Sequence, residues 1–185
     1  MRRSTLILIT GLAAAAIAAC TKQSLQTTFD KQTTYIENFV SARMKEDTNA
    51  TLTRNGGAYR VNLHDTLSQQ RDSLKWGQKV SLYYGCFTLT SASLNTSNLI
   101  ATNLQALAKQ AKWSLTDTTL FKLDTLVLDG ALVTGLADGL AGVQPKDEGY
   151  ILFTGKYGYG KNQRGMIPAL SALAYYFWIE EIIDE

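Results

Sequence analysis

The spacing of apolar positions predicts a helix near the start of the chain. Five apolar residues recur at intervals of three, four and seven: Phe29, Ile36, Phe39, Val40 and Met44. Residues that repeat in this way lie on one face of an α-helix, so we predict an amphipathic helix over residues 26–46. Residues 47–57 are rich in asparagine and glycine, which favours a loop that ends in a turn.

Alternating and β-branched stretches predict an antiparallel sheet. These stretches are residues 58–63, about 77–89, 120–128, 148–154 and 173–183. The first two alternate apolar and polar residues, which is the pattern of a strand with one buried face. The last contains consecutive aromatic and β-branched residues, which favours a central strand buried on both faces rather than a helix.

Two later segments show helical spacing again. One covers residues 99–112 and the other covers residues 133–143. In the second, Leu136, Leu140 and Val143 repeat at intervals of four and three. Several strands with one short helix between the later ones predict an α+β fold with an antiparallel sheet.

The first nineteen residues have the character of a bacterial export signal. Arg2 and Arg3 precede an apolar run over residues 6–19, which is too short to span a bilayer comfortably. The sequence Ile17-Ala18-Ala19-Cys20 resembles the lipobox of bacterial lipoproteins, in which the cysteine thiol receives a diacylglycerol and the chain is cut before it. We therefore predict that Cys20 is lipidated, with an ordinary signal peptide and a chance cysteine as the alternative.

This anchor predicts a location at the cell envelope. Several acyl chains on Cys20 would hold the chain on a lipid bilayer, since each buried CH2 contributes about 0.8 kcal/mol. The polar residues 21–28 would serve as a tether. Some diderm bacteria send lipoproteins to the cell surface with an acidic cluster after the cysteine. Residues 21–24 contain no acid, which favours the periplasmic face of the outer membrane, and a cell-surface location stays open.

Charge and composition narrow the kinds of site to expect. Without residues 1–19 the 18 basic residues fall to 16, equal to the 16 acidic ones, so no nucleic-acid partner is expected. His64 is the single histidine, and Cys86 is the cysteine that remains once Cys20 is lipidated. We therefore expect no His/Cys metal site and no intrachain disulfide, and we predict that Cys86 is a small buried core residue.

The second half of the chain carries several motifs in a specific order. They are GQKVSLYY at residues 77–84, Leu132-Val133 with Gly135, Tyr157-Gly158-Tyr159-Gly160, Ile167-Pro168 and Leu173-Ala174-Tyr175. Over residues 57–183, apart from 90–122, this order is similar to that of the FKBP family of peptidyl-prolyl cis-trans isomerases. The resemblance implies an α+β, FKBP-like half-barrel. In this fold a bent antiparallel sheet wraps around a short helix, and here an N-terminal helix precedes it.

The resemblance also implies which residues form the site. The catalytic positions would be Tyr84, Val133, Tyr159, Ile167 and Tyr175, and the substrate-binding positions would be Leu132, Leu136, Leu94 and Asn95. The family uses no metal, cofactor or nucleophile, because an apolar pocket receives the prolyl ring and favours the twisted amide. An ordinary core role stays open for those of these residues that would be buried in any such half-barrel: Tyr84, Val133, Leu136 and Tyr175.

The sequence departs from the family pattern in three places, which involve four residues. Leu136 stands where the family usually has a tryptophan, and Ala169 stands where it has a second proline. Leu94-Asn95 aligns without a gap on the family's Phe-Asp pair, so an aromatic wall and an acid are replaced. Trp113 is a candidate for the missing wall. These changes weaken the expectation of efficient catalysis and leave the predicted fold intact.

The sequence thus predicts three regions and leaves two functions open. The regions are a lipoprotein signal peptide at 1–19, a lipid anchor, tether and helix at 20–56, and an FKBP-like domain at 57–185 with an insertion at about 90–122. The first function is a membrane-anchored prolyl isomerase that helps proline-containing polypeptides to fold. The alternative is a catalytically weak, FKBP-like binding subunit of an outer-membrane protein assembly complex.

Overall fold

The structure, a computed structural model, describes the backbone of residues 3–63 and 72–183 and the side chains of residues 23–63 and 72–183. It contains two compact units, Met1–Lys31 and Gln32–Glu185. The predicted signal peptide, the Cys20 thiol and His64 therefore fall outside the described side chains. Within the described residues, no helix is long and apolar enough to cross a membrane.

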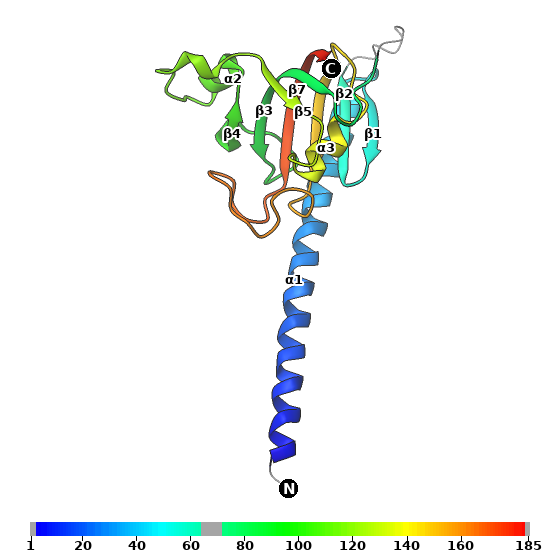
Figure 1. Cartoon of the computed structure of the whole chain (residues 1–185), viewed down its shortest axis with the longest axis vertical. Coiled ribbons are helices and arrows are strands. Elements are labelled where there is room, and N and C mark those ends of the chain that lie inside the picture. Colours follow the sequence, from blue (N-terminus) through cyan, green and yellow to red (C-terminus); the bar gives the residue numbers. More distant parts are fainter. Residues whose placement is uncertain (1–2, 64–71, 184–185) are drawn as a thin grey trace. The chain divides into compact units, whose positions relative to one another are not determined.

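The second unit is built on a seven-stranded antiparallel sheet (Figure 1). Its strands are β1 (Thr51–Asn55), β2 (Ala58–Leu63), β3 (Lys79–Thr88), β4 (Leu99–Thr102), β5 (Asp124–Val127), β6 (Glu148–Phe153) and β7 (Leu173–Ile183). They lie in the order β1-β2-β6-β7-β3-β4, and β5 pairs with the first half of β3. The helices are α1 (Arg3–Glu46), α2 (Gln105–Gln110) and α3 (Thr134–Leu140), with 3-10 turns η1 (Thr96–Asn98) and η2 (Thr118–Leu120).

Most of the predicted elements are confirmed. Helix α1 contains the predicted residues 26–46 and ends at Glu46, but it begins at Arg3, so residues 21–28, which were predicted to be a tether, are helical. Strands β2, β3, β6 and β7 and helix α3 fall within the predicted segments or within a residue of their ends. Strand β7 lies between β6 and β3, so it is the predicted central strand. Burial explains why this segment is not a helix, since side chains on both of its faces are buried, as at Ala174 and Phe177.

The predicted helix over residues 99–112 is wrong in its first half. Leu99–Thr102 forms β4 and pairs with β3, with Cys86 opposite Ala101. Helix α2 is therefore only six residues long. Pairing with a long neighbouring strand buries Leu99 and outweighs the helical spacing of the apolar residues that follow.

The predicted loop over residues 47–57 contains a strand. Thr51–Asn55 forms β1, which pairs with β2 so that Asn55 lies opposite Ala58. The turn between them is made by Gly56, at a φ of +54°, and Gly57, as the turn signal predicted. The strand itself was missed because Thr51–Asn55 is a mostly polar edge strand with no buried side chain to mark it.

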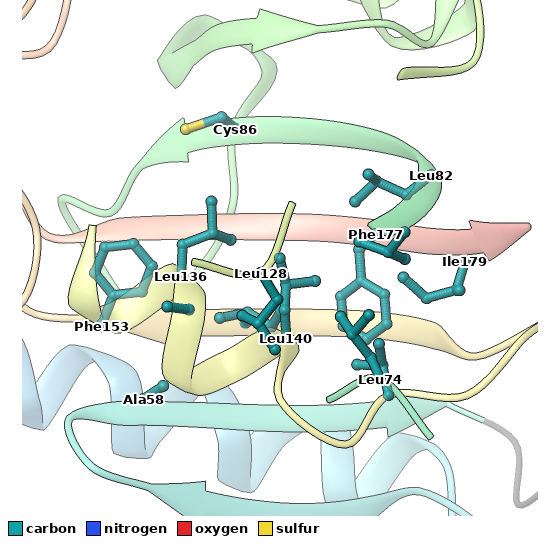
Figure 2. Close-up of a cluster of buried hydrophobic side chains, with 14 of the residues drawn as sticks. Ala58, Leu74, Leu82, Cys86, Leu128, Leu136, Leu140, Phe153, Phe177 and Ile179 are labelled. Carbon is teal, nitrogen blue, oxygen red and sulfur yellow. The ribbon is translucent and has the colours of Figure 1, made fainter. Parts of the chain in front are cut away.

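Alternation along the strands gives the sheet two apolar faces. On β6, Ile151 joins the core under α3 and Leu152 joins the core under the last turns of α1, and both are fully buried. Figure 2 shows the α3 core, in which Leu136 and Leu140 of α3 lie over Phe177 and Leu128. On the other face, Ile36, Phe39 and Val40 of α1 pack on Val61 and Leu152.

Helix α3 is held at both ends. At its start Gly135 lies so close to Phe153 that a Cβ at this position would come within 2.2 Å of the phenyl ring. At its end the guanidinium of Arg60 on β2 donates to the carbonyls of Gly139 (3.0 Å) and Ala141 (2.7 Å). A buried cation on the last carbonyls opposes the negative end of the helix and satisfies its unpaired acceptors. The position of α3 over the sheet is therefore fixed.

Candidate functional site

A cavity of about 210 Å³ lies between α3 and the sheet. Side chains from six elements and two connecting loops line it: Leu82, Tyr84, Cys86, Ala101, Asp124, Leu126, Leu132, Leu136, Leu140, Ile151, Tyr159, Ile167, Tyr175 and Phe177. Six of the predicted site residues are thereby brought together, namely Tyr84, Leu132, Leu136, Tyr159, Ile167 and Tyr175. The lining is mostly apolar with a few polar groups, which is the usual character of a small-ligand pocket.

Val133 lies next to the cavity rather than on its wall. Its side chain packs against the same core. Its carbonyl accepts hydrogen bonds from Leu136 (2.9 Å) and Ala137 (3.0 Å), which begin α3. The amide of Gly135 donates to the Tyr157 carbonyl at 2.8 Å, so the start of α3 is joined to the loop that carries Tyr159.

The loop of residues 154–172 supplies Tyr159 and Ile167, and α1 fastens both of its ends. The side chain of Gln32 accepts from the Gly155 amide (2.9 Å) and donates to the Leu170 carbonyl (2.6 Å). Leu170 in turn donates to the Gly160 carbonyl at 2.6 Å. One buried amide side chain therefore closes the base of the loop that faces the cavity.

Aromatic rings form one wall of the cavity. The ring centroids of Tyr84 and Tyr175 are 6.3 Å apart, and Tyr175 stacks on Phe153 at 6.0 Å. The hydroxyl of Tyr175 and the thiol of Cys86 share a hydrogen bond inside this wall. Burial raises the pKa of Cys86 to about 12 and also raises the pKa of Tyr175, so both groups stay protonated at neutral pH. The predicted core position of Cys86 is confirmed, because the residue is 2% exposed.

Asp124 adds a carboxylate that sequence reasoning did not assign to the site. It begins β5 and lies exposed on the rim of the cavity. The pKa of Tyr84 is raised, mainly by burial and further by the negative charge of Asp124. The signal available in the sequence was Asp124-Thr125, which is typical of a turn, and the amide of Thr125 does bond the Asp124 carboxylate at 2.9 Å.

A buried asparagine holds the backbone of Tyr84. Asn103 is 5% exposed, and its side-chain oxygen accepts from the Tyr84 amide at 2.7 Å. Its side-chain nitrogen donates to the carbonyls of Leu82 and Lys122, both at 3.0 Å. Asn103 thus fills the gap where the partner of β3 changes from β5 to β4. Tyr84 is fixed in the wall by these bonds.

The structure does not bring Leu94 and Asn95 to the cavity, which corrects their predicted placement. Leu94 packs against the core under α1, on the opposite face of the sheet, and the Asn95 side chain caps η1 by accepting from the Ser97 amide at 3.0 Å. An alignment without a gap fails because a loop separates β3 from β4. The strand that lies beside β3 presents Ala101 to the cavity instead.

Several other lining residues could have been found from alternation. Leu82, Tyr84 and Cys86 are two residues apart on β3 and therefore share a face, as do Tyr175 and Phe177 on β7. Ala101 could not be found in this way, because its segment was predicted to be a helix. No group of three or more potential metal-binding side chains occurs among the described residues.

Among the solved structures similar to this chain are two of FKBP domains and one of FkpA, whereas no family model and no curated protein matches its sequence. The structure of the three FKBP domains of wheat FKBP73 has a TM-score of 0.55 at 11% identity, covering 74% of this chain and 52% of that structure. The N-terminal domain of FKBP42 from Arabidopsis thaliana has a TM-score of 0.50 at 13% identity, with 72% and 93% covered. FkpA from Escherichia coli has a TM-score of 0.54 at 10% identity, with 98% and 73% covered.

These similarities concern the fold alone. This chain spans about half the length of the wheat structure, 52%. Identities between 10% and 13% carry no information about activity. The α+β fold with a bent antiparallel sheet and an N-terminal helix is the FKBP-like half-barrel that the sequence predicts.

Proposed function

We propose that this protein receives the prolyl ring of a polypeptide in the cavity and accelerates cis-trans isomerisation of the peptide bond before the proline. The observation that carries the proposal is that Tyr84, Tyr159, Ile167 and Tyr175 converge on one small apolar cavity. The FKBP-like fold supports it, because the similar structures are FKBP domains.

The proposed mechanism needs no nucleophile and no metal. Rotation about an X-Pro bond is slow because amide resonance is lost at the transition state. The twisted amide has less charge separation than the planar one, so an apolar cavity stabilises it relative to the ground state. This is differential binding of the transition state. Uncatalysed isomerisation takes tens to hundreds of seconds, so even a modest acceleration affects folding.

Each lining residue then has a proposed role. Leu136 and Ile167 would pack on the prolyl ring, and Tyr84 and Tyr175 would form the aromatic wall. Tyr159 would donate a hydrogen bond from its hydroxyl to a substrate carbonyl. The backbone beside Leu132 would bind the peptide through its polar groups.

A protease-coupled assay with proline-containing peptides tests this function on the full chain in detergent. We expect acceleration above background at micromolar protein, a lower rate for Tyr159→Phe, and a higher rate for Leu136→Trp, which enlarges the flat apolar floor. Ala169→Gly, at a residue outside the cavity lining, serves as the control. A wild-type chain and a Leu136→Trp variant that both match background would overturn the proposal.

A second candidate function is a binding subunit without significant catalysis. Two observations favour it, since the floor is the aliphatic Leu136 and the described residue that β4 contributes to the cavity is Ala101, which has no polar side chain. Such a subunit would belong to an outer-membrane protein assembly complex. Affinity purification from detergent-solubilised membranes tests this, and a protein recovered alone would count against it.

We also propose that Cys20 carries the acyl anchor that keeps the domain at the envelope, on the periplasmic face of the outer membrane. The lipobox-like Ile17-Ala18-Ala19-Cys20 supports this. In membrane fractionation the wild-type chain should stay with the membranes, and Cys20→Ala should abolish acylation detected by mass spectrometry. A wild-type chain whose mass shows an unmodified Cys20 would contradict the anchor.

A further inference from the structure

The loop of residues 154–172 carries cations and no acid, and we call it the basic loop. Lys156, Lys161 and Arg164 are its charged residues, and all three are exposed. Within the described part of the chain, no carboxylate forms an ion pair with any of them. The chain without residues 1–19 has equal numbers of acidic and basic residues, so the basic loop is a local excess of positive charge.

The tip of the basic loop is a tight turn that presents an apolar side chain. Arg164 and Ile167 exchange backbone hydrogen bonds of 3.0 and 2.8 Å, and Gly165, at a φ of +53°, helps to form the turn between them. Met166 lies in this turn and is 67% exposed. An apolar side chain beside cations suits the boundary of a bilayer, where the cations stay with the headgroups and the apolar side chain reaches the acyl region.

The basic loop lies where the chain enters the second compact unit. Gln32, the first residue of that unit, bonds the Gly155 amide and the Leu170 carbonyl and so fastens both ends of the loop. Figure 1 shows the loop, in orange, beyond the ends of β6 and β7. Cys20 lies twelve residues before Gln32, which is at most roughly 40 Å of extended chain. A bilayer that holds Cys20 is therefore within reach of the loop.

Neighbouring segments at this end of the sheet do not cancel the charge of the basic loop. The loop between β3 and β4 contains no charged residue. Asp138 contacts the β1–β2 turn, and Arg54 lies on the strand that leads into that turn. On α1, Asp30 and Lys31 precede Gln32, and Glu37 follows it. These neighbours together carry one more acid than base, so the three cations of the loop leave a positive surplus.

We propose that the basic loop binds the anionic headgroups of the bilayer to which Cys20 anchors the chain. Lys161 and Arg164 would bind lipid phosphates, and Met166 would enter the boundary between headgroups and acyl chains. Because the same loop supplies two residues of the cavity lining, this contact would hold the cavity close to the membrane surface. The inference rests on the proposed Cys20 anchor, and its three contact residues are not part of the cavity lining.

Quenching of a tryptophan by brominated lipids tests the contact. The chain purified from membranes is reconstituted into vesicles of brominated phosphatidylcholine, alone or with about 30% phosphatidylglycerol as the anionic lipid. Met166→Trp is compared with wild type, so that the difference isolates position 166 from the native Trp76, Trp113 and Trp178. The new indole should be quenched on the anionic vesicles and much less on the zwitterionic ones. Salt at about 0.5 M should abolish this difference, because it screens the charges.

Charge variants in the Met166→Trp background show whether the cations drive the contact. Lys161→Gln and Arg164→Gln should each lower the ratio of docked to undocked loop about fivefold at low salt, as expected for one cation near an anionic surface. Lys75→Gln and Lys109→Gln are the matched controls, because both lysines are exposed and lie outside the loop, and they should leave the quenching unchanged. Circular dichroism checks that each variant is folded.

The outcomes separate the basic loop from the anchor. If the chain is acylated and stays with the vesicles but position 166 is unquenched on both kinds, the inference is wrong and the anchor stands. Equal quenching on both kinds of vesicle, or full quenching in Lys161→Gln and Arg164→Gln, also overturns the inference, since the headgroup charge then has no role. A chain with an unmodified Cys20 that leaves the vesicles overturns the anchor and the inference together.

Discussion

The two faces of the sheet are formed by the same strands, but the helices that cover them pack differently. Under α3 the core leaves a cavity, whereas under α1 the side chains of Ile36, Phe39 and Val40 fill the space, with exposures of 0%, 3% and 4%. Helix length accounts for much of the difference. Helix α3 has seven residues and covers roughly 10 Å, while the eleven residues of β7 extend over roughly 36 Å. A short helix on a long sheet leaves room for a ligand.

The polar groups of the two faces differ as well. Tyr175 and Tyr176 are neighbours on β7 and point to opposite faces. The hydroxyl of Tyr176 donates to the Glu148 carboxylate at 2.6 Å, beside a groove lined by Tyr150 and Phe87. Tyr175 instead lines the cavity with its partner Cys86. Both tyrosines therefore line a concave surface, and the two surfaces differ in their polar groups, because Tyr176 is paired with a carboxylate and Tyr175 lies in an apolar wall.

The largest expected effect comes from two neighbouring residues of β6. Ile151→Ala and Leu152→Ala should each lower the free energy of unfolding by about 2–5 kcal/mol, because both side chains are fully buried. Only Ile151→Ala should change proline-peptide affinity, since Ile151 lines the cavity. Urea unfolding and calorimetry measure the two quantities. An equal change of affinity in both variants would show that the two faces are not independent.

The next largest effect is expected from Gln32 of α1, whose side chain holds the loop that supplies Tyr159 and Ile167 to the cavity. Gln32→Leu leaves the Gly155 amide and the Leu170 carbonyl without their partner, which should cost about 2 kcal/mol of stability and weaken peptide binding. Gln26→Leu is the matched control on the same helix, because its described hydrogen bond is to Asp30 one turn away. An unchanged peptide affinity in Gln32→Leu would mean that the loop keeps its shape without α1.

A pH effect should follow from the thiol in the cavity wall. The pKa of Cys86 is raised from 9.0 to about 12 in the folded protein. The unfolded chain therefore loses this proton first, and stability, complete below pH 9, falls as the pH rises toward 12. We expect a loss of about 1 kcal/mol between pH 8 and pH 10. Urea unfolding of wild type and Cys86→Ala at these two pH values checks it, and an equal slope in both would contradict it.

The smallest expected effect compares the two tyrosines directly. Tyr175→Phe and Tyr176→Phe should each change stability by about 0.5–1.5 kcal/mol, since each removes one hydrogen bond. Tyr175→Phe should also tighten proline-peptide binding about fivefold or less, because it makes the cavity more apolar. Tyr176→Phe should leave binding unchanged. Tighter binding in both variants would remove the distinction between the two faces.

The sequence predicts the α3 side of the cavity well because local patterns define it. The helical spacing predicts that Leu136 and Leu140 face the core. The aromatic and β-branched composition of residues 173–183 predicts a strand buried on both faces, and Tyr175 lies on that strand. The resemblance to the FKBP family predicted that Tyr159 and Ile167 belong to the site. Periodicity could not predict it, because both residues lie in a loop. The half-barrel is correspondingly predictable from residues 132–183.

The β4 side could not be predicted for a physical reason. Ala101 reaches the cavity through pairing with β3, fifteen residues earlier in the chain, and no local pattern records such a pairing. The loop between β3 and β4 also places Leu94 at the core under α1 and Asn95 at the start of η1, away from the cavity. The role of the buried Asn103 could not be predicted either, because its hydrogen-bond partners are backbone groups of residues distant in the sequence.

The two hydrogen bonds of the Gln32 side chain also indicate where an independently folding fragment can begin. The compact unit starts at Gln32, and Ile36, Phe39 and Val40 follow it at once. A fragment cut at residue 57, where the resemblance begins, would leave Val61, Leu152 and Ala174 facing water. Such a fragment would expose an apolar sheet surface that favours aggregation. Fragments for expression and crystallisation should therefore begin before residue 32.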